Sequence, residues 1–580
     1  MLKRLLKSIR EFKTASILTP IFMCVEVFME IAIPFLLSKL IDEGIANNDT
    51  KQITILGIML VLSAGLSLVF GVLSGRFAAK ASSGFAKNLR EDIYNKIQDF
   101  SFFNIDKFST SSLVTRLTTD VTNVQQAYMM IIRAAVRAPI TIIFAIIMSF
   151  VIDTRIGIIY LVATPILGFL LIFIANYVRP IFKKVFNQID HLNCVVQENV
   201  KAIRVVKSFV TEEKEIGKFN KISDEIYQNF SRAEKILAFN SPIMQITIYT
   251  CLTLISYFGA RFIVIGTLTT GELTSLFSYI MQMLSSLMLL SMVFVMITMA
   301  WESGQRIVEV LEEEPDLKNK ENPIYEVKNG KIEFKNVGFS YVKDKKKEIL
   351  KKINLTINSG ETVGIIGGTG DGKSSLVNLI PRLYDVTSGE VKVGGINVKD
   401  YDLKTLRDQV SMVLQKNELF SGTIKDNIRW GNLQATDEEI VEVCKLAQAD
   451  EFITGFPDGY DTMIEQGGAN VSGGQKQRLC IARALLKKPK ILILDDSTSA
   501  VDTKTDSLIR KAFSEKIPNT TKIIIAQRIS SVQDADKIIV MSNGRIQAIG
   551  KHEELLRNNK IYKEIYTSQT KGSEAYEQKV

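Results

Sequence analysis

The chain has 580 residues, 46% of them hydrophobic, and a mean hydropathy of +0.14. This length predicts at least two domains, and the apolar excess before about residue 300 excludes a wholly soluble enzyme. The net charge of +9 clusters beside apolar segments, so we interpret it as cytoplasmic anchoring charge and not as a nucleic-acid surface. The five cysteines form no C-x-x-C pair, which argues against a disulfide framework or a cysteine metal site.

Six apolar segments follow a basic N-terminal stretch. Residues 1–13 (MLKRLLKSIREFK) predict an amphipathic helix on the inner membrane surface. The segments lie at roughly 15–38, 54–76, 127–152, 156–178, 241–265 and 273–299. Each has roughly the 20 residues that a membrane-crossing helix needs. We therefore predict six spans.

Two of the links between the spans, residues 77–126 and 179–240, are long, basic and helical in period. The positive-inside rule places both links and both termini in the cytoplasm, with the spans continuing as helices beyond the bilayer. Turn-like breaks at residues 102–112 and 209–215 predict short helices that touch a cytoplasmic domain. Ordinary solvated loops are the alternative.

Charged residues lie within the spans, where an ionisable group costs roughly 2.5 kcal/mol or more on insertion scales. Glu26 and Glu30 share one face of the first span, and Arg133 and Arg137 share one face of the third. The carboxylates either line a cavity that favours cationic amphipathic substrates or form ion pairs and hydrogen bonds between helices. We leave both interpretations open.

The last span is rich in methionine, whose soft side chain suits varied ligands, although ordinary helix packing explains this composition equally well. The residues of the predicted substrate cavity are Glu26, Glu30, Met281, Met288 and Met292.

The composition becomes polar over residues 301–330, where Pro315 and Pro323 stop helices, and this predicts a linker. Beyond it, GGTGDGKSS (residues 367–375) follows a short apolar run and precedes a helical pattern. This order predicts a phosphate-binding loop, in which glycine N–H groups close around phosphates and Lys373 reaches the β and γ oxygens. The Ser374 hydroxyl is then placed to bind Mg²⁺.

Further motifs follow in the cytoplasmic half. Gln415 comes after an apolar strand, and VSGGQKQR (residues 471–478) opens a helix whose start can bind a second anion. KILILDD predicts a buried strand that ends in Asp495 and Asp496, and TKIIIAQR predicts another strand. If the phosphate loop and the VSGGQ helix start cannot meet within one domain, a second copy must complete the site.

These motifs, in this order behind six spans, resemble an ATP-binding cassette (ABC) exporter half-transporter over nearly the whole chain. The resemblance implies an all-α transmembrane domain with six helices, the type I or type IV ABC exporter fold, plus a cytoplasmic α/β P-loop nucleotide-binding domain. We expect the transmembrane domain over residues 1–300, the linker over 301–330, the nucleotide-binding domain over 331–570 and a polar tail over 571–580. The breaks in the two long links match the family's coupling helices.

The resemblance also implies ATP and Mg²⁺ as cofactors and a head-to-tail dimer that holds two ATP molecules between its subunits. Tyr341 would stack on adenine, Gln415 would touch Mg²⁺ and sense the membrane domain, and Asp495 would hold Mg²⁺. Ser472 and Gly474 would contact the γ-phosphate of ATP held by the opposite subunit. The implied nucleotide-binding residues are Tyr341, Gly367, Gly370, Gly372, Lys373, Ser374, Ser375, Gln415, Ser472, Gly473, Gly474, Gln475 and Asp495. The implied Mg²⁺ ligands are Ser374, Gln415 and Asp495.

Two positions depart from the family pattern. Asp496 stands where Glu normally orients the attacking water, and its side chain is shorter by about 1.5 Å. Gln527 stands where a histidine normally contacts the γ-phosphate, and the chain's two histidines, His191 and His552, lie elsewhere. Misplacement on the order of 1 Å can cost roughly 100-fold in rate. We therefore expect a site that binds ATP and hydrolyses it poorly, as in the degenerate-site subunit of bacterial heterodimeric multidrug exporters.

These expectations combine into a plasma-membrane, multi-pass ATPase subunit that exports amphipathic, drug-like compounds. Its expected partners are a second ABC half-transporter, membrane lipid and small amphipathic, cationic molecules, with no nucleic acid. Three alternatives stay open: a slow homodimer with Asp496 as a working base, a homodimeric lipid or peptide exporter, and an ATP-gated channel or regulator.

Overall fold

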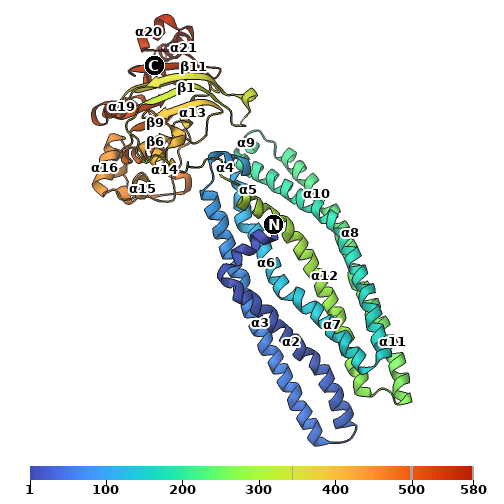
Figure 1. Cartoon of the computed structure of the whole chain (residues 1–580). Helices are drawn as coiled ribbons and strands as arrows, with labels where there is room; N and C mark the ends of the chain where they lie inside the picture. The colour runs from blue at the N-terminus through green and yellow to red at the C-terminus, as the bar shows by residue number, and fades with distance from the viewer. Residues whose placement is uncertain (343, 497–500, 578–580) are drawn as a thin grey trace. The chain divides into compact units, whose positions relative to one another are not determined.

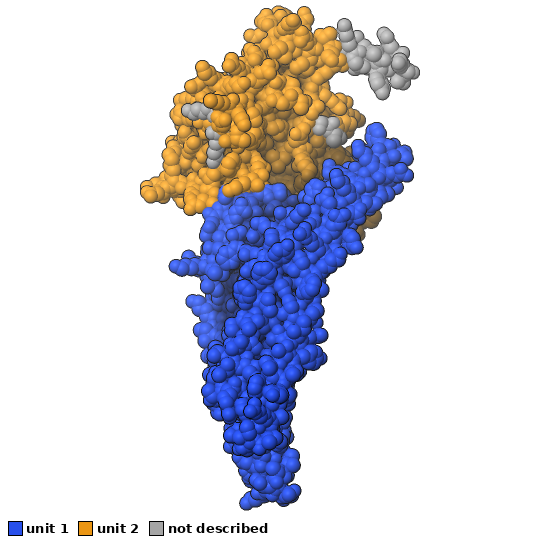
Figure 2. Space-filling model, turned by 90° about the vertical axis from the view of Figure 1, so that its right-hand side faces the viewer, with its two compact units in different colours: residues 1–99, 108–313 blue, residues 100–107, 314–580 orange. Residues whose placement is uncertain are grey.

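The computed structural model describes residues 1–342, 344–496 and 501–577, apart from the side chains of Lys345 and of residues 571–577. The chain forms two compact units, Met1–Asp99 with Phe108–Glu313, and Phe100–Lys107 with Glu314–Val580. Figure 2 colours them separately. Each unit has its own core, so each is described by itself.

The first unit is entirely helical in its described part (Figure 1). Its elements are α1 (Leu2–Leu6), η1 (Lys7–Phe12), α2 (Lys13–Lys39), η2 (Leu40–Ile45), α3 (Thr50–Gln98), α5 (Thr110–Thr115), η3 (Arg116–Asp120), α6 (Val121–Ile132), α7 (Ala134–Ile152), α8 (Thr154–Lys201), α9 (Ile203–Ser208), α10 (Glu212–Leu237), α11 (Asn240–Ile265) and α12 (Thr270–Glu312). A further short helix, α4 (Phe102–Phe108), begins in the second unit.

Six helical stretches in the described residues are long and apolar enough to cross a membrane, which confirms the predicted number of spans. Each contains 43 to 54 residues, or roughly 65–80 Å of helix at 1.5 Å per residue. This length is more than twice the roughly 30 Å of the hydrocarbon layer. The prediction that the spans continue well beyond the bilayer is therefore also confirmed.

The N-terminus differs from the single amphipathic helix predicted over residues 1–13. The stretch is divided into α1 and η1, and within η1 the backbone leaves helical geometry at Arg10, where φ is 43°. Ser8 donates a hydrogen bond of 2.6 Å to Asp92 of α3, and Arg10 forms an ion pair with the same carboxylate. These polar contacts tie the stretch to α3, which explains the break.

Short helices form near both predicted breaks. Helix α4 lies within residues 102–112, as predicted, but α9 ends at Ser208, just before residues 209–215. The chain turns at Val210, where φ is 53°, and α10 begins at Glu212. The predicted position of the second short helix was therefore too late in the chain.

The described residues of the second unit form an α/β structure with three sheets (Figure 1). A six-stranded sheet has the order β12-β11-β3-β10-β9-β6, a four-stranded antiparallel sheet has the order β2-β1-β4-β5, and β7 pairs with β8. The strands are β1 (Ile332–Phe339), β2 (Leu350–Ile357), β3 (Thr362–Gly367), β4 (Ser388–Val393), β5 (Ile396–Asn397), β6 (Val410–Val413), β7 (Gly422–Thr423), β8 (Met463–Ile464), β9 (Ile491–Asp495), β10 (Thr521–Ile525), β11 (Lys537–Ser542) and β12 (Arg545–Gly550).

Helices surround these sheets. They are α13 (Lys373–Asn378), α14 (Leu403–Gln409), α15 (Ile424–Arg429), α16 (Asp437–Leu446), α17 (Asp450–Thr454), α18 (Gly473–Leu486), α19 (Thr503–Lys516), α20 (His552–Asn558) and α21 (Lys560–Glu577). Short 3-10 turns, η4 to η8, occur at Lys345–Lys347, Val398–Asp400, Gly459–Asp461, Gln466–Gly468 and Ile529–Ser531. The stretch predicted as a polar tail is thus helical as far as Glu577, and residues 578–580 lie outside the described part.

The central strands of the larger sheet, β3, β9 and β10, are almost fully buried. They are parallel, with Ile525 of β10 paired to Ile365 of β3 and to Asp495 of β9. Continuous apolar runs such as ILILD and KIII fit strands covered on both faces. Because the strands are parallel, their carboxyl ends, which carry the motifs predicted from the sequence, lie at one edge of the sheet.

Candidate functional site

The phosphate loop connects β3 to α13. Gly370 and Gly372 have φ values of +89° and +86°, a left-handed conformation that favours glycine. A Cβ on Gly372 would also lie 2.8 Å from Leu350 Cδ2. Both positions therefore favour glycine, and the binding of phosphate by this loop stays a prediction.

Lys373 lies against the backbone of this loop. Its ammonium donates hydrogen bonds to the carbonyl oxygens of Gly367, at 2.8 Å, and Gly368, at 2.7 Å. Burial lowers the pKa of Lys373, while the nearby carboxylates of Asp371, Asp495 and Asp496 oppose this shift. A half-buried cation at a glycine cradle fits the phosphate oxygens of a nucleotide.

Ser374 and Asp495 meet at the carboxyl edge of the sheet. The Ser374 hydroxyl donates a hydrogen bond of 3.0 Å to Asp495 Oδ1. Burial raises the pKa of Asp495, and the charge of Asp496 raises it further. The Ser374 hydroxyl and the buried Asp495 carboxylate are adjacent oxygen donors, and such a pair suits Mg²⁺.

Asp496 directly follows β9 in a left-handed backbone conformation, with φ at 49°. Its Oδ2 accepts a hydrogen bond of 2.6 Å from Gln527 Nε2 and a longer one of 3.5 Å from Gln415 Nε2. Burial raises the pKa of Asp496, and these amide donors oppose the shift. The structure thus brings together Gln415, Asp496 and Gln527, three residues singled out from the sequence.

Gln569 of α21 is a contact that the sequence analysis missed. Its side-chain Nε2 donates to the carbonyl oxygen of Gln527 at 2.7 Å, and its Oε1 accepts from the N–H of Ile529 at 2.9 Å. One amide therefore holds the backbone on both sides of residue 528. Because Gln569 lies 42 residues beyond Gln527, no local pattern could indicate this contact.

Asp371, inside the phosphate loop, was also not singled out. Its carboxylate accepts hydrogen bonds from the N–H groups of Gly368, at 2.6 Å, and Asn543, at 2.8 Å. It thereby ties the loop to the turn between β11 and β12. An acid between two loop glycines was the available signal in GGTGDGKSS.

Tyr341 lies beside the phosphate loop. Its hydroxyl is 3.0 Å from Ser375 Oγ, and its ring contacts Phe339 and Tyr384 edge-on at 4.8 and 5.0 Å between centroids. The ring is partly exposed. Its stacking on adenine stays a prediction.

Ser472 is the N-cap of α18. Its hydroxyl accepts a hydrogen bond of 3.3 Å from the N–H of Gln475, whose Oε1 accepts one of 2.9 Å from the N–H of Ser472. Ser472 and Gly473 are exposed, and Gly474 is half-buried. Among the hydrogen bonds of the described residues, none joins 471–475 to the phosphate loop. This arrangement is consistent with the expectation that a second copy completes each site.

Residues 102–107 of the first predicted coupling segment belong to the second unit and contact other residues of that unit. Tyr384 donates a hydrogen bond of 3.0 Å to Asp106, and its ring lies 6.0 Å from that of Phe102. Burial and the Asp106 carboxylate both raise the pKa of Tyr384. For this segment the structure favours a docked helix over a solvated loop.

The charges predicted in the spans form an ion-pair cluster. Arg137 donates from Nη1 to Glu26 Oε1 at 2.8 Å and from Nη2 to Glu30 Oε2 at 2.7 Å. The two carboxylates therefore share one guanidinium, and these ion pairs join α7 to α2. Of the two interpretations left open, the structure supports ion pairing between helices.

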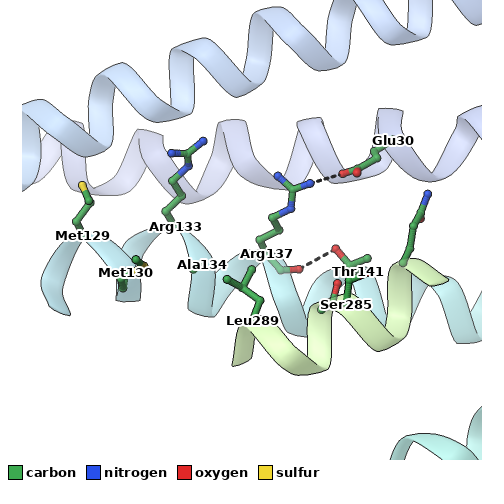
Figure 3. Close-up of a pocket in the computed structure, with 11 residues that line it drawn as sticks. Glu30, Met129, Met130, Arg133, Ala134, Arg137, Thr141, Ser285 and Leu289 are labelled. Carbon is green, nitrogen blue, oxygen red and sulfur yellow. Dashed lines mark hydrogen bonds and ion pairs between the residues drawn. The ribbon is translucent and has the colours of Figure 1, made fainter. Parts of the chain in front are cut away.

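A cavity of about 440 Å³ lies next to this cluster, within the helical unit (Figure 3). Its lining includes Glu30, Arg133, Arg137, Gln282 and Leu289. Glu26 and the predicted Met281, Met288 and Met292 are not among its lining residues. These three methionines are exposed on the helical unit.

Two family descriptions match the chain, "ABC transporter transmembrane region" over residues 16–287 and "ABC transporter" over residues 350–499. The protein YfiB of Bacillus subtilis, an ABC transporter ATP-binding protein, is 37% identical over 96% of each chain. The chain belongs to the ABC transporter family.

Other similarities agree with this identification of an ABC exporter half-transporter. YgaD of Bacillus subtilis, which is named as a multidrug export ATP-binding/permease protein, is 32% identical over 98% of this chain and 99% of its own. The structure of a bacterial Atm1-family ABC exporter with ATP bound superposes with a TM-score of 0.85 at 23% identity, over 97% of this chain and 99% of that chain. The latter likeness shows the fold, so the predicted fold class is confirmed.

The ABC transporter chain is a multi-pass plasma-membrane protein with a cytoplasmic nucleotide-binding domain. Its ABC domain binds ATP and makes the protein an ATPase-coupled transporter.

Proposed function

We propose that this ABC transporter exports amphipathic, drug-like compounds across the plasma membrane as one subunit of a heterodimer, and that its own site binds ATP but hydrolyses it poorly. The observation that carries the proposal is the 2.6 Å hydrogen bond from Gln527 to Asp496. It joins the two positions at which the sequence departs from the family pattern.

Nucleotide binding rests on residues that are in place. The glycines of the phosphate loop present backbone N–H groups, and Lys373 can exchange its two carbonyl partners for phosphate oxygens. We assign Mg²⁺ to Ser374, Asp495 and Gln415, where it would neutralise phosphate charge. Tyr341 would take the adenine ring. At each of these positions the chain keeps the residue type that nucleotide binding needs.

Hydrolysis needs a base that reaches and orients a water molecule. The carboxylate of Asp496 lies one carbon–carbon bond, about 1.5 Å, short of where a glutamate would place it. Its Oδ2 is already engaged by the amides of Gln527 and Gln415. A glutamine at 527 also carries no ionisable proton. Together these features predict a loss of at least roughly 100-fold in rate.

The intact VSGGQ segment would serve the other subunit. Ser472 and Gly473 are exposed at the start of α18, as an N–H cluster that receives an outside anion should be. We therefore expect a partner half-transporter that supplies a competent base and receives Ser472 and Gly474 at its own ATP.

The test compares four proteins purified without a partner: wild type, Asp496→Glu, Gln527→His and the double variant. All four should bind ATP with similar affinity. We expect little phosphate release from the wild type and from each single variant, and a clear gain from the double variant. Lys373→Ala serves as the control that loses ATP binding.

Fast phosphate release by the wild-type chain alone would contradict the proposal. If Asp496→Asn then abolished this activity, the chain would be an active homodimer with Asp496 as its working base. A gain on co-expression with a second half-transporter, measured against each subunit alone, would support the heterodimer.

A further inference from the structure

Arg133 differs from the other cation of the membrane cavity. Arg137 shares its charge with two carboxylates, at 2.8 and 2.7 Å. Arg133 has no ion pair and no side-chain hydrogen bond among the residues that the structure describes. It is exposed and lines the cavity of about 440 Å³. In Figure 3 the side chains of both arginines point in the same direction, and Arg137 is the one that reaches Glu30.

The backbone sets Arg133 apart as well. It lies between α6 and α7, at φ −114° and ψ −71°, where the helix is interrupted. Pro139, inside α7, cannot donate a backbone hydrogen bond and crowds the preceding turn. On the neighbouring α3, Gly75 lies beside the guanidinium: a Cβ there would be in ordinary van der Waals contact, 3.9 Å from its terminal nitrogens.

The rest of the cavity lining is mixed. Met129, Met130 and Leu289 supply apolar surface, and Gln282 contributes an amide. Its Oε1 is buried and accepts no hydrogen bond in the described part of the chain. A ligand with an apolar body and a polar head fits such a lining.

We infer that this cavity binds amphipathic anions, whose carboxylate or phosphate head is taken by Arg133 while the apolar body lies against Met129, Met130 and Leu289. The inference deepens the proposed export function, on which it rests, by naming the charge of the ligand. A guanidinium stays charged and offers forked donors that match carboxylate and phosphate oxygens. An ionisable side chain inside a span is also by default a functional-site hypothesis.

A cationic ligand fits this cavity less well. Glu30 lines it, but its Oε2 is held by Arg137. Glu26 does not line it, and the Glu26 Oε2 is buried. One carboxylate, that of Glu30, and two guanidiniums, those of Arg133 and Arg137, line the cavity, so the charge of its lining does not favour a cation. Among the described charged groups of the lining, the one without an ion pair is the Arg133 guanidinium.

The test uses two probes with the same apolar body, pyrenebutanoate and its trimethylammonium counterpart. The full-length chain is reconstituted in phosphatidylcholine nanodiscs, and binding is followed by pyrene fluorescence. We expect the wild type to bind the anion about tenfold more tightly than the cation. Arg133→Gln should remove this difference, and Arg133→Lys should keep most of it. Arg261→Gln, which removes an exposed arginine of α11 outside the cavity lining, is the matched control and should change nothing.

Equal affinity for both probes in the wild type, or an unchanged preference in Arg133→Gln, would overturn the inference. Phosphatidylglycerol is then added to the nanodiscs. Competition with pyrenebutanoate that Arg133→Gln abolishes would identify a lipid headgroup as the anion, whereas no competition would identify a free solute.

The inference and the proposed function can fail separately. ATP-driven transport of drug-like compounds without any anion preference would overturn the inference and leave the export function standing. Anion binding that depends on Arg133, but without ATP-driven movement into vesicles in any subunit combination, would support the binding site and refute export.

Discussion

Replacing Gln569 by leucine should loosen the loop that carries Gln527. The amide of Gln569 makes two hydrogen bonds to the backbone of this loop, at 2.7 and 2.9 Å. Each such bond contributes roughly 0.5–1.5 kcal/mol net, so the pair holds the loop with roughly 1–3 kcal/mol. At 1.4 kcal/mol per factor of ten, loss of both bonds would raise local opening roughly 5- to 150-fold. Because Gln569 is exposed, we expect the lower part of this range.

Hydrogen-exchange mass spectrometry of the peptide covering residues 525–531 measures this opening directly, since the N–H of Ile529 is one of the bonded groups. Gln569→Glu keeps an acceptor for Ile529 but loses the donor to the Gln527 carbonyl, so it should give an intermediate increase. Thr567→Val is the control, because within the described part of the chain the Thr567 hydroxyl bonds to the Lys563 carbonyl of its own helix and to no other group. If this peptide exchanged at the wild-type rate in Gln569→Leu while α21 stayed protected, Gln569 would not hold the loop.

Further changes test the membrane cluster and the nucleotide site. Arg137→Met leaves Glu26 and Glu30 without their shared partner, so it should destabilise the protein by roughly 3–5 kcal/mol. This loss should lower the unfolding temperature in detergent, and Glu30→Gln should lower it much less. Asp495→Asn should stabilise the nucleotide-free protein, because burial raises the pKa of Asp495 and the folded state holds its charge unfavourably at pH 7. A gain in stability of about 1 kcal/mol would raise the unfolding temperature by roughly 2–4 °C. This gain should shrink as the pH falls toward the raised pKa, because the wild-type carboxyl then becomes neutral. A gain that grows on acidification would contradict this reasoning. Tyr341→Phe should bind ATP almost as the wild type does, whereas Tyr341→Ala should weaken binding roughly fivefold or more through lost stacking; equal affinities of the two variants in a nucleotide titration would remove Tyr341 from the adenine site.

The spans could be predicted because length and hydropathy are local properties. The second short helix could not be placed, because IRVVKS continues the helical period of α8 and only Ala202, at φ −97° and ψ 14°, separates α9 from it. The turn that follows places Val210 at a φ of 53°. A β-branched residue rarely adopts this conformation, so no sequence rule indicates a turn there.

The membrane charges show a different limit of sequence reasoning. A spacing of four residues placed Glu26 with Glu30 and Arg133 with Arg137 on common helix faces. It could not show which arginine meets the carboxylates, because Glu26 and Arg137 are 111 residues apart and their contact depends on how α2 and α7 pack. In the same packing Arg133 lines the cavity and forms no ion pair with the described residues, so the two arginines differ in their contacts.

The departures at 496 and 527 looked like two separate defects in the sequence. In the sheet they are one feature, because β9 and β10 are adjacent parallel strands, with Asp495 paired to Ile525, and the residues just beyond their ends become neighbours. A short aspartate and a long glutamine close the gap with a bond of 2.6 Å. Asp496→Glu alone would push the carboxylate about 1.5 Å into the glutamine that now bonds it. Gln527→His alone would leave the short carboxylate without that amide. Each single change therefore disturbs a matched pair, and only their combination can restore a base beside a histidine, so their effects on turnover should be far from additive.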